Sequence, residues 1–331
     1  MAAIIAFFKT YVLDYLIDSL AFGATFMYGS TGEILTEKAG HLNLGIPGIM
    51  CMGGAGGCLV LNLIGNSALP PFLIVILGIL GAFASGMLMG LIYAFLTVTM
   101  RANQNVTGLT LTTFGSGLMM VLMGNKKVID VNTYLVIPKA YYRFPFAGRT
   151  DSLQKLGVMF FMAVILVFAA SYMLFRTKVG LNLRAVGENP ATADSAGINV
   201  TRYKYLATCI GAGISGLGGL YYIMDYMASQ EAYKSVEAFG WLSIALVIFV
   251  LWRPHMTLPG SFLFGALLSC SSIVAAIFSQ FDLILPMYAK PLLKMLPYVF
   301  TIIVLVLASV RNKRESQPPA SLGLSYFREE R

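Results

Sequence analysis

Amide and hydroxyl side chains gather in a short polar stretch between two long apolar segments of this sequence. The stretch reads Arg-Ala-Asn-Gln-Asn-Val-Thr-Gly over residues 101–108, and Thr112 follows it. An amide side chain offers donors and an acceptor together, so such groups suit the recognition of a neutral polar solute such as a sugar or a nucleobase. Helix capping and hydrogen bonding between helices are the structural alternative for each of these residues.

A second polar stretch places charges among residues that interrupt helices. Residues 32–48 read Gly-Glu-Ile-Leu-Thr-Glu-Lys-Ala-Gly-His-Leu-Asn-Leu-Gly-Ile-Pro-Gly, in which four glycines and a proline surround the charged side chains. This pattern predicts a break in a helix, and a broken helix in a bilayer exposes backbone groups only where protein or a watery cavity satisfies them. Polar groups at membrane depth are costly and are therefore functional candidates. From the two stretches we predict a translocation path that includes Asn43, Asn103, Asn105, Thr107 and Thr112.

No arrangement of residues indicates catalysis. His41 and His255 are the only histidines, and neither has a convincing nucleophile and carboxylate partner. There is no Gly-Lys pair, so the usual nucleotide-binding P-loop is absent and energy from ATP would have to come from another subunit. The four cysteines lie in apolar segments without the spacing of metal ligands. We therefore expect no enzyme activity, metal or cofactor in this chain.

An ion relay would need acidic residues deep inside the apolar segments. The nearest cases fall near the predicted ends of those segments, at Asp14, Asp18, Asp225 and Asp282. A secondary transporter driven by a proton or sodium gradient remains an alternative, because broken helices can bind sodium through backbone carbonyls alone.

The segment Arg184 to Gly197 carries the signals of short capped helices. Asn189 is a good N-cap, Pro190 suits the first helical position, and Gly197 suits a left-handed residue after the end, so residues 190–196 are predicted to form one helix. Residues 180–186, closed by Gly187, are predicted to form another. Helices this short are unstable alone and must be held by the membrane domain or by another protein. An ordinary polar turn is the alternative.

Membrane-spanning helices must position these stretches. The composition is 57% hydrophobic and 11% charged, whereas about a quarter of residues are charged in soluble domains. A bilayer core about 30 Å thick needs about 20 apolar residues per helix. Nine hydrophobic segments are present, near residues 12–32, 44–65, 71–99, 102–125, 156–175, 205–224, 238–252, 256–281 and 295–310. The expected fold is all-α, a polytopic membrane protein of about 8–10 transmembrane helices with broken or re-entrant segments.

The predicted spans define one transmembrane domain over residues 1–312. We expect residues 126–155 to form an external loop, residues 176–204 a cytoplasmic loop, and residues 313–331 a cytoplasmic tail. This orientation places slightly more lysine and arginine inside than outside. Glycines at helical spacing, among them Gly53 and Gly216, predict close helix packing, either within the chain or against a partner.

Three runs of sequence resemble the permease subunits of ATP-binding cassette (ABC) importers. They are Gly-Glu-Ile-Leu-Thr-Glu-Lys-Ala-Gly-His-Leu-Asn-Leu-Gly-Ile-Pro-Gly-Ile-Met at 32–50, the polar run at 101–108, and Gly-Glu-Asn-Pro-Ala-Thr-Ala-Asp-Ser-Ala-Gly-Ile at 187–198. The family handles branched-chain amino acids, ribose-type sugars and nucleosides, and the resemblance extends from about residue 10 to 312. The form Glu-Lys-Ala-Gly-x-Leu-Asn-Leu-Gly most resembles the nucleoside permeases that work with a binding lipoprotein. Pro47 stands where relatives often carry Glu, so a substrate role of that position does not transfer to this chain.

The resemblance implies a bacterial inner (plasma) membrane protein with several partners. These are a second permease in a heterodimer, or a second copy in a homodimer, an ABC ATPase that holds ATP and Mg²⁺, and an extracytoplasmic solute-binding lipoprotein. It implies that 187–197 is a coupling helix that enters a groove in the ATPase, through the residues Glu188, Asn189, Pro190, Ala191, Ala193, Asp194 and Gly197. The expected solute is a nucleoside or a related small polar molecule, with a simple sugar as the alternative. The basic residues are too scattered to indicate binding of nucleic acid.

Overall fold

The structure is a computed structural model, and it describes residues 12–65, 67–125, 128–130, 156–280, 286–311, 317–324 and 326. Within those ranges the chain is helical and forms no strand. The α-helices are α2 (Leu13–Lys38), α3 (Ile46–Ile64), α4 (Pro71–Ala94), α5 (Gln104–Met123), α8 (Val158–Arg176), α9 (Lys178–Glu188), α10 (Pro190–Ser195), α11 (Val200–Leu220), α12 (Tyr233–Phe249), α13 (Pro254–Gln280), α14 (Ala289–Lys294) and α15 (Leu296–Arg311). Short π-helices, η2 (Phe95–Thr99) and η4 (Tyr221–Tyr226), extend α4 and α11, and the 3-10 turn η5 (Gln230–Ala232) precedes α12.

Seven helical stretches in the described part of the chain are long and apolar enough to cross a membrane. They are Ile46–Ile64, Pro71–Thr99, Gln104–Met123, Val158–Arg176, Val200–Tyr226, Gln230–Phe249 and Pro254–Ala275. The first and last of the nine predicted segments overlap α2 and α15. The predicted all-helical membrane fold is therefore confirmed. Most of the predicted external loop, residues 131–155, lies outside the described residues.

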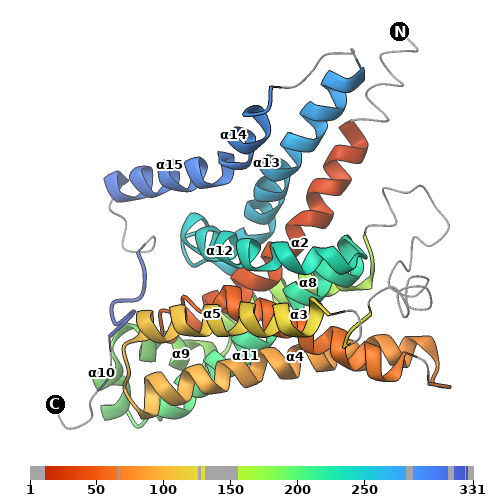
Figure 1. Cartoon of the computed structure of the whole chain (residues 1–331). Helices are drawn as coiled ribbons and strands as arrows, with labels where there is room; N and C mark the ends of the chain where they lie inside the picture. The colour runs from red at the N-terminus through yellow and green to blue at the C-terminus, as the bar shows by residue number, and fades with distance from the viewer. Residues whose placement is uncertain are drawn as a thin grey trace.

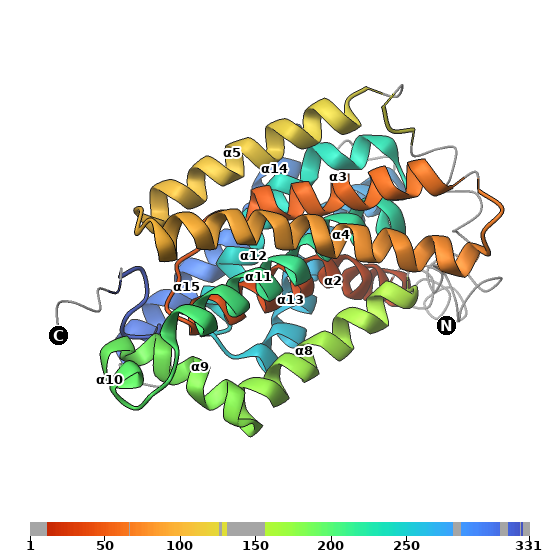
Figure 2. The same ribbon diagram turned by 90° about the horizontal axis from the view of Figure 1, so that it is seen from below.

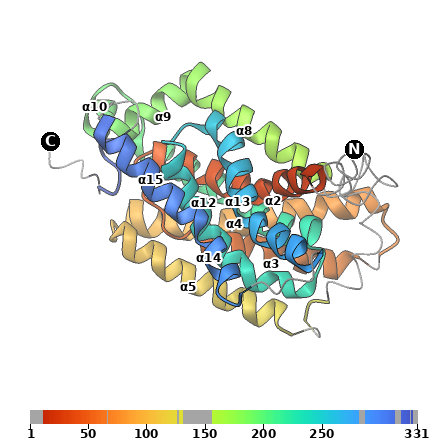
Figure 3. The ribbon, with the colours of Figure 1, turned by 90° about the horizontal axis from the view of Figure 1, so that it is seen from above.

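Helices α2 and α11 form the centre of the bundle. α11 packs against α2, α3 and α4, while α2 also packs against α12 and α13. In Figure 2, α5 and α8 lie on opposite edges of the molecule, and α9 and α10 lie at the same end as the C-terminus. Figure 1 shows α2 and α13 rising side by side away from α4, and Figure 3 shows α14 and α15 lying across α12 and α13.

Glycine allows these central helices to touch through their backbones. A Cβ atom on Gly53 of α3 would lie 2.2 Å from the Cα atom of Gly216 on α11. A Cβ atom on Gly32 of α2 would lie 2.2 Å from the carbonyl oxygen of Gly211. Real Cβ atoms do not approach so closely, so only glycine permits these helix crossings. The predicted glycine faces therefore pack within this chain.

Candidate functional site

Two short helices between α8 and α11 are capped by their own side chains. The Oγ1 atom of Thr177 accepts a hydrogen bond from the backbone N–H of Gly180 at 3.1 Å, at the start of α9. The Oδ1 atom of Asn189 accepts one from the N–H of Thr192 at 3.0 Å, and Pro190 is the first residue of α10. Gly197 has a left-handed φ of 83°. The caps predicted from Asn189, Pro190 and Gly197 are therefore present, because capping depends on residues that are close in sequence.

The predicted end of the first short helix is wrong. Gly187 does not close it, because α9 runs on to Glu188. A Cβ atom on Gly187 would lie 2.2 Å from the carbonyl oxygen of Lys38, the last residue of α2. Glycine is needed here because α9 presses against the end of α2, and the helix ends one residue later, where Asn189 begins the cap of α10.

The described C-terminal residues 317–324 and 326, which we call segment 317–326, contact α9 and α10. Ser321 donates to the carbonyl oxygen of Gly187 through both Oγ (2.5 Å) and its backbone N–H (3.1 Å). The N–H of Ala320 donates to a Glu188 carboxylate oxygen at 3.4 Å, and the Tyr326 hydroxyl donates to Asp194 at 3.0 Å. Two of the predicted coupling residues, Glu188 and Asp194, thus accept hydrogen bonds from the C-terminal segment of the same chain. Nothing in the local sequence indicates these contacts.

One face of α10 is exposed and the other is buried. Glu188, Asn189, Ala191 and Gly197 are exposed, and Pro190 and Asp194 are half-buried. Ala193 is different, because it packs against Val186 and Val200 in a small apolar cluster. In this conformation its side chain faces its own domain, and its place in a docking surface stays a prediction.

The stretch between α2 and α3 is a helix break, as predicted. Residues 39–45 are not helical, and Gly40 has a φ of 86°. Side chains from other helices satisfy the freed backbone groups in two places. The Gln104 amide oxygen accepts from the N–H of Leu42 at 2.8 Å, and the Tyr93 hydroxyl donates to its carbonyl oxygen at 2.7 Å. The C-terminal segment also reaches this break, where the N–H of Gly323 donates to the carbonyl oxygen of Gly40 at 3.3 Å.

The five residues predicted for the translocation path do not lie on one surface. Asn43, Thr107 and Thr112 are buried, whereas Asn103 and Asn105 are exposed. The Thr112 hydroxyl donates to the carbonyl oxygen of Leu44 at 2.9 Å, and Asn43 accepts from the N–H of Gly45 at 2.9 Å. Asn103 caps α5 by accepting from the N–H of Val106 at 3.1 Å. Three of the five therefore support the backbone near the helix break in this conformation.

Sequence reasoning missed two buried carboxyl groups in α2. The predicted span ended at residue 32, but α2 continues to Lys38 and buries Glu33 and Glu37. One Glu33 oxygen accepts from the N–H of Asn43 at 3.2 Å, and Trp252 Nε1 donates to Glu37. The second Glu33 oxygen has no hydrogen-bond partner among the described residues. The four-residue spacing of the two glutamates was the available signal, since it places them on one face of a helix.

Metal-ligating side chains do not cluster in the described part of the chain. No group of three or more metal-ligating side chains comes together among the residues that the structure describes. Cys51 and Cys58 are free and buried, in agreement with their interpretation as small core residues.

The long apolar helices of the bundle define a multi-pass helical membrane protein. Residues 15–308 match the family described as branched-chain amino acid transport system / permease component, and the chain belongs to this family. A putative glucose ABC transporter permease protein, TsgC13 of Haloferax volcanii, is 32% identical over 90% of this chain and 92% of its own. The nucleoside ABC transporter permease protein NupC of Lactococcus lactis is 30% identical over 88% of this chain and 90% of its own. The guanosine ABC transporter permease protein NupQ of Bacillus subtilis is 29% identical, over 87% and 89%. The resemblance inferred from the three sequence runs is confirmed.

Proposed function

We propose that this chain forms the membrane path for a nucleoside or a related small polar solute in a bacterial inner-membrane importer. Two of the similar permeases are described as nucleoside and guanosine permeases, which supports this class of solute. The glucose permease among the relatives supports a simple sugar as the alternative. The solute would arrive from an extracytoplasmic binding lipoprotein and pass between this chain and a second permease subunit.

A separate ATPase would supply the energy by pushing on α9 and α10. The observation that carries this proposal is the position of α9, whose Gly187 touches the end of α2 at Lys38. A force on the exposed face of α10 would reach the break between α2 and α3 through that backbone contact and through the hydrogen bonds of segment 317–326. Closure of the ATPases around ATP and Mg²⁺ would then move the helix bundle between outward-open and inward-open states.

The α10 surface is tested by placing a bulky charge on it. Ala191→Arg should reduce solute uptake and ATPase association about tenfold or more, because an unpaired charge in an interface costs about 2–5 kcal/mol. Ala68→Arg is a matched control, since Ala68 is also exposed but lies beyond the opposite end of α3. Glu188→Lys and Pro190→Gly should abolish uptake. The lipoprotein should keep its affinity for solute in both variants. Normal uptake in Ala191→Arg, Glu188→Lys and Pro190→Gly would contradict the coupling role.

The solute class is tested by uptake into cells with and without this gene. Labelled nucleosides should enter only when the gene is present, and vanadate, which blocks ABC ATPases, should stop their entry. Gene-dependent uptake of glucose without nucleoside uptake would replace the nucleoside proposal with the sugar alternative. Uptake by the purified chain alone in liposomes, driven by an ion gradient, would instead establish a secondary transporter.

A further inference from the structure

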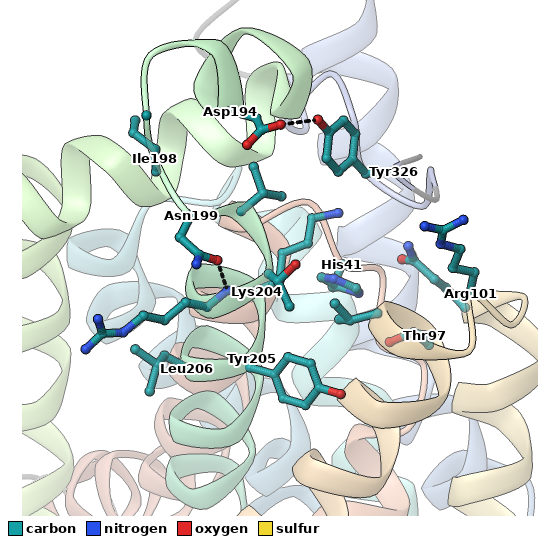
Figure 4. Close-up of a pocket in the computed structure, with 16 residues that line it drawn as sticks. His41, Thr97, Arg101, Asp194, Ile198, Asn199, Lys204, Tyr205, Leu206 and Tyr326 are labelled. Carbon is teal, nitrogen blue, oxygen red and sulfur yellow. Dashed lines mark hydrogen bonds between the residues drawn. The ribbon is translucent and has the colours of Figure 1, made fainter. Parts of the chain in front are cut away.

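A cavity of about 760 Å³ lies beside the coupling helices, between α10, the first turns of α11 and the end of η2. Figure 4 shows that Asp194 and Tyr326 lie on one side of it, while Lys204, His41 and Arg101 come from three other parts of the chain. The cavity does not include the five residues predicted for the translocation path. The cavity is therefore not formed by the residues predicted for that path.

Lys204 is the most unusual residue in this cavity. Its side chain belongs to α11 and is only 3% exposed. Its ammonium group has no hydrogen bond or ion pair with any residue that the structure describes. An ammonium group that lines a cavity on a largely buried side chain, and has no protein partner, can pair with an anion that enters the cavity.

His41 is a second buried group without a partner. It is 1% exposed, and neither of its ring nitrogens has a hydrogen-bond partner among the described residues. Burial, together with the positive charge of Lys204, holds the pKa of His41 well below its usual range. The neutral ring keeps one N–H that can donate to a bound oxygen atom.

Basic side chains outnumber acidic ones in the described lining of the cavity. Among the described residues, the lining includes the basic residues Lys204, Arg101 and Arg202 and one acidic residue, Asp194, which accepts a hydrogen bond from Tyr326. The N-terminus of α11, a helix of 21 residues, also borders the cavity and adds a partial positive charge.

We propose that this cavity binds a phosphate-bearing anion. Among the described lining residues, three basic side chains against one carboxylate leave an excess of positive charge, which suits the anionic oxygens of a phosphate monoester or phosphodiester. The phosphate comes from a dissolved phosphate compound or from the headgroup of an anionic lipid. Gly197 and Ile198 of the coupling loop line the same cavity, so the bound anion contacts the element that we assign to the ATPase.

The test measures binding of labelled inorganic phosphate to the full chain in nanodiscs of uncharged phosphatidylcholine, at constant ionic strength. We expect saturable binding of one phosphate per chain. Lys204→Met should weaken it about tenfold or more, because it removes a charge-assisted hydrogen bond. Lys204→Arg should keep most of the affinity. Lys178→Met is the matched control, since Lys178 is exposed at the start of α9 and does not line the cavity.

A second arm distinguishes the two sources of phosphate. If a lipid headgroup is the natural occupant, phosphatidylglycerol should compete with labelled phosphate in mixed nanodiscs, and native mass spectrometry should show it retained by the wild-type chain and by Lys204→Arg. If a dissolved compound is the occupant, phosphatidylglycerol should leave phosphate binding unchanged.

Two results would overturn the proposal. One is the absence of both phosphate binding and phosphatidylglycerol retention in the wild-type chain. The other is an equal affinity of the wild-type chain and a folded Lys204→Met variant. Neither result depends on the solute that is transported, so a failure here leaves the test of the permease function intact.

Discussion

The centre of the bundle and the end that carries α9 and α10 are held together by different forces. In the centre, α2, α3 and α11 touch through glycines, and a Cβ atom at Gly53 would already collide with α11. At the coupling end, which we define as residues 39–45, 178–199 and 317–326, Gly187 makes a close backbone contact with Lys38, but the C-terminal segment and the helix break are attached mainly by hydrogen bonds. Close packing resists any change of shape, whereas a hydrogen bond contributes about 1 kcal/mol and can be exchanged for another. We therefore expect the bundle to resist deformation more strongly than the hydrogen-bonded contacts of the coupling end do.

The largest expected effect lies in the glycine contacts. Gly53→Ala should lower the free energy of unfolding by about 1–3 kcal/mol, because the new methyl group would lie 2.2 Å from the backbone of Gly216 and the helices must separate. The measurement is the thermal unfolding midpoint in detergent, followed by tryptophan fluorescence.

Gly117→Ala on α5 is the control for this substitution. A Cβ atom at Gly117 meets nothing within 4 Å, so the change should be neutral or slightly stabilising through helix propensity. Equal losses of stability in the two variants would mean that the close approach of α3 and α11 does not limit this fold.

The cap of α10 should give a smaller and more local effect. Asn189→Ala removes the acceptor for the N–H of Thr192 and should cost about 1 kcal/mol, while the unfolding midpoint of the whole chain hardly changes. Hydrogen exchange of the α10 amides should become about fivefold faster, because this helix has only six residues and little packing of its own.

Asn199→Ala gives the matched comparison for that cap. Asn199 caps α11 in the same way, by accepting from the N–H of Arg202 at 2.9 Å, but α11 is fixed by its packing in the bundle. Exchange in α11 beyond its first turn should not change. A similar acceleration along the whole of α11 would contradict the division between packed and hydrogen-bonded regions.

The smallest effect is expected where the C-terminal segment meets α9. Ser321→Ala removes the hydroxyl bond to the carbonyl oxygen of Gly187 but leaves the backbone bond, so it should cost about 0.5–1 kcal/mol. Limited proteolysis should cut segment 317–326 severalfold faster. Ser67→Ala, which removes a 2.5 Å hydroxyl bond to Ile64 beyond the opposite end of α3, should leave that cleavage rate unchanged. An unchanged rate in Ser321→Ala would show that the segment is held without this bond.

The local features of the coupling end could be predicted from sequence, but its long-range contacts could not. Asn189, Pro190 and Gly197 act on neighbours within a few residues, so their types and order were sufficient. Residues 313–331 were predicted only as a cytoplasmic tail, because the bonds of segment 317–326 to Gly187 and Glu188 join residues more than 130 positions apart. The same limit applies to Thr112, whose hydroxyl bonds to Leu44 across 68 positions. An Asn or Thr that binds solute and one that supports a backbone look alike in sequence, since both need only the same donors and acceptors.

The most direct test of the account is photo-cross-linking from α10. A benzoylphenylalanine residue placed at exposed Ala191 should, on illumination of native membranes, form a covalent adduct between this chain and a separate ABC ATPase subunit. The same probe at Ala68, beyond the opposite end of α3, should form none. Absence of an ATPase adduct from Ala191, or equal adducts from both positions, would contradict the assignment of α9 and α10 as the entry point of the transport energy.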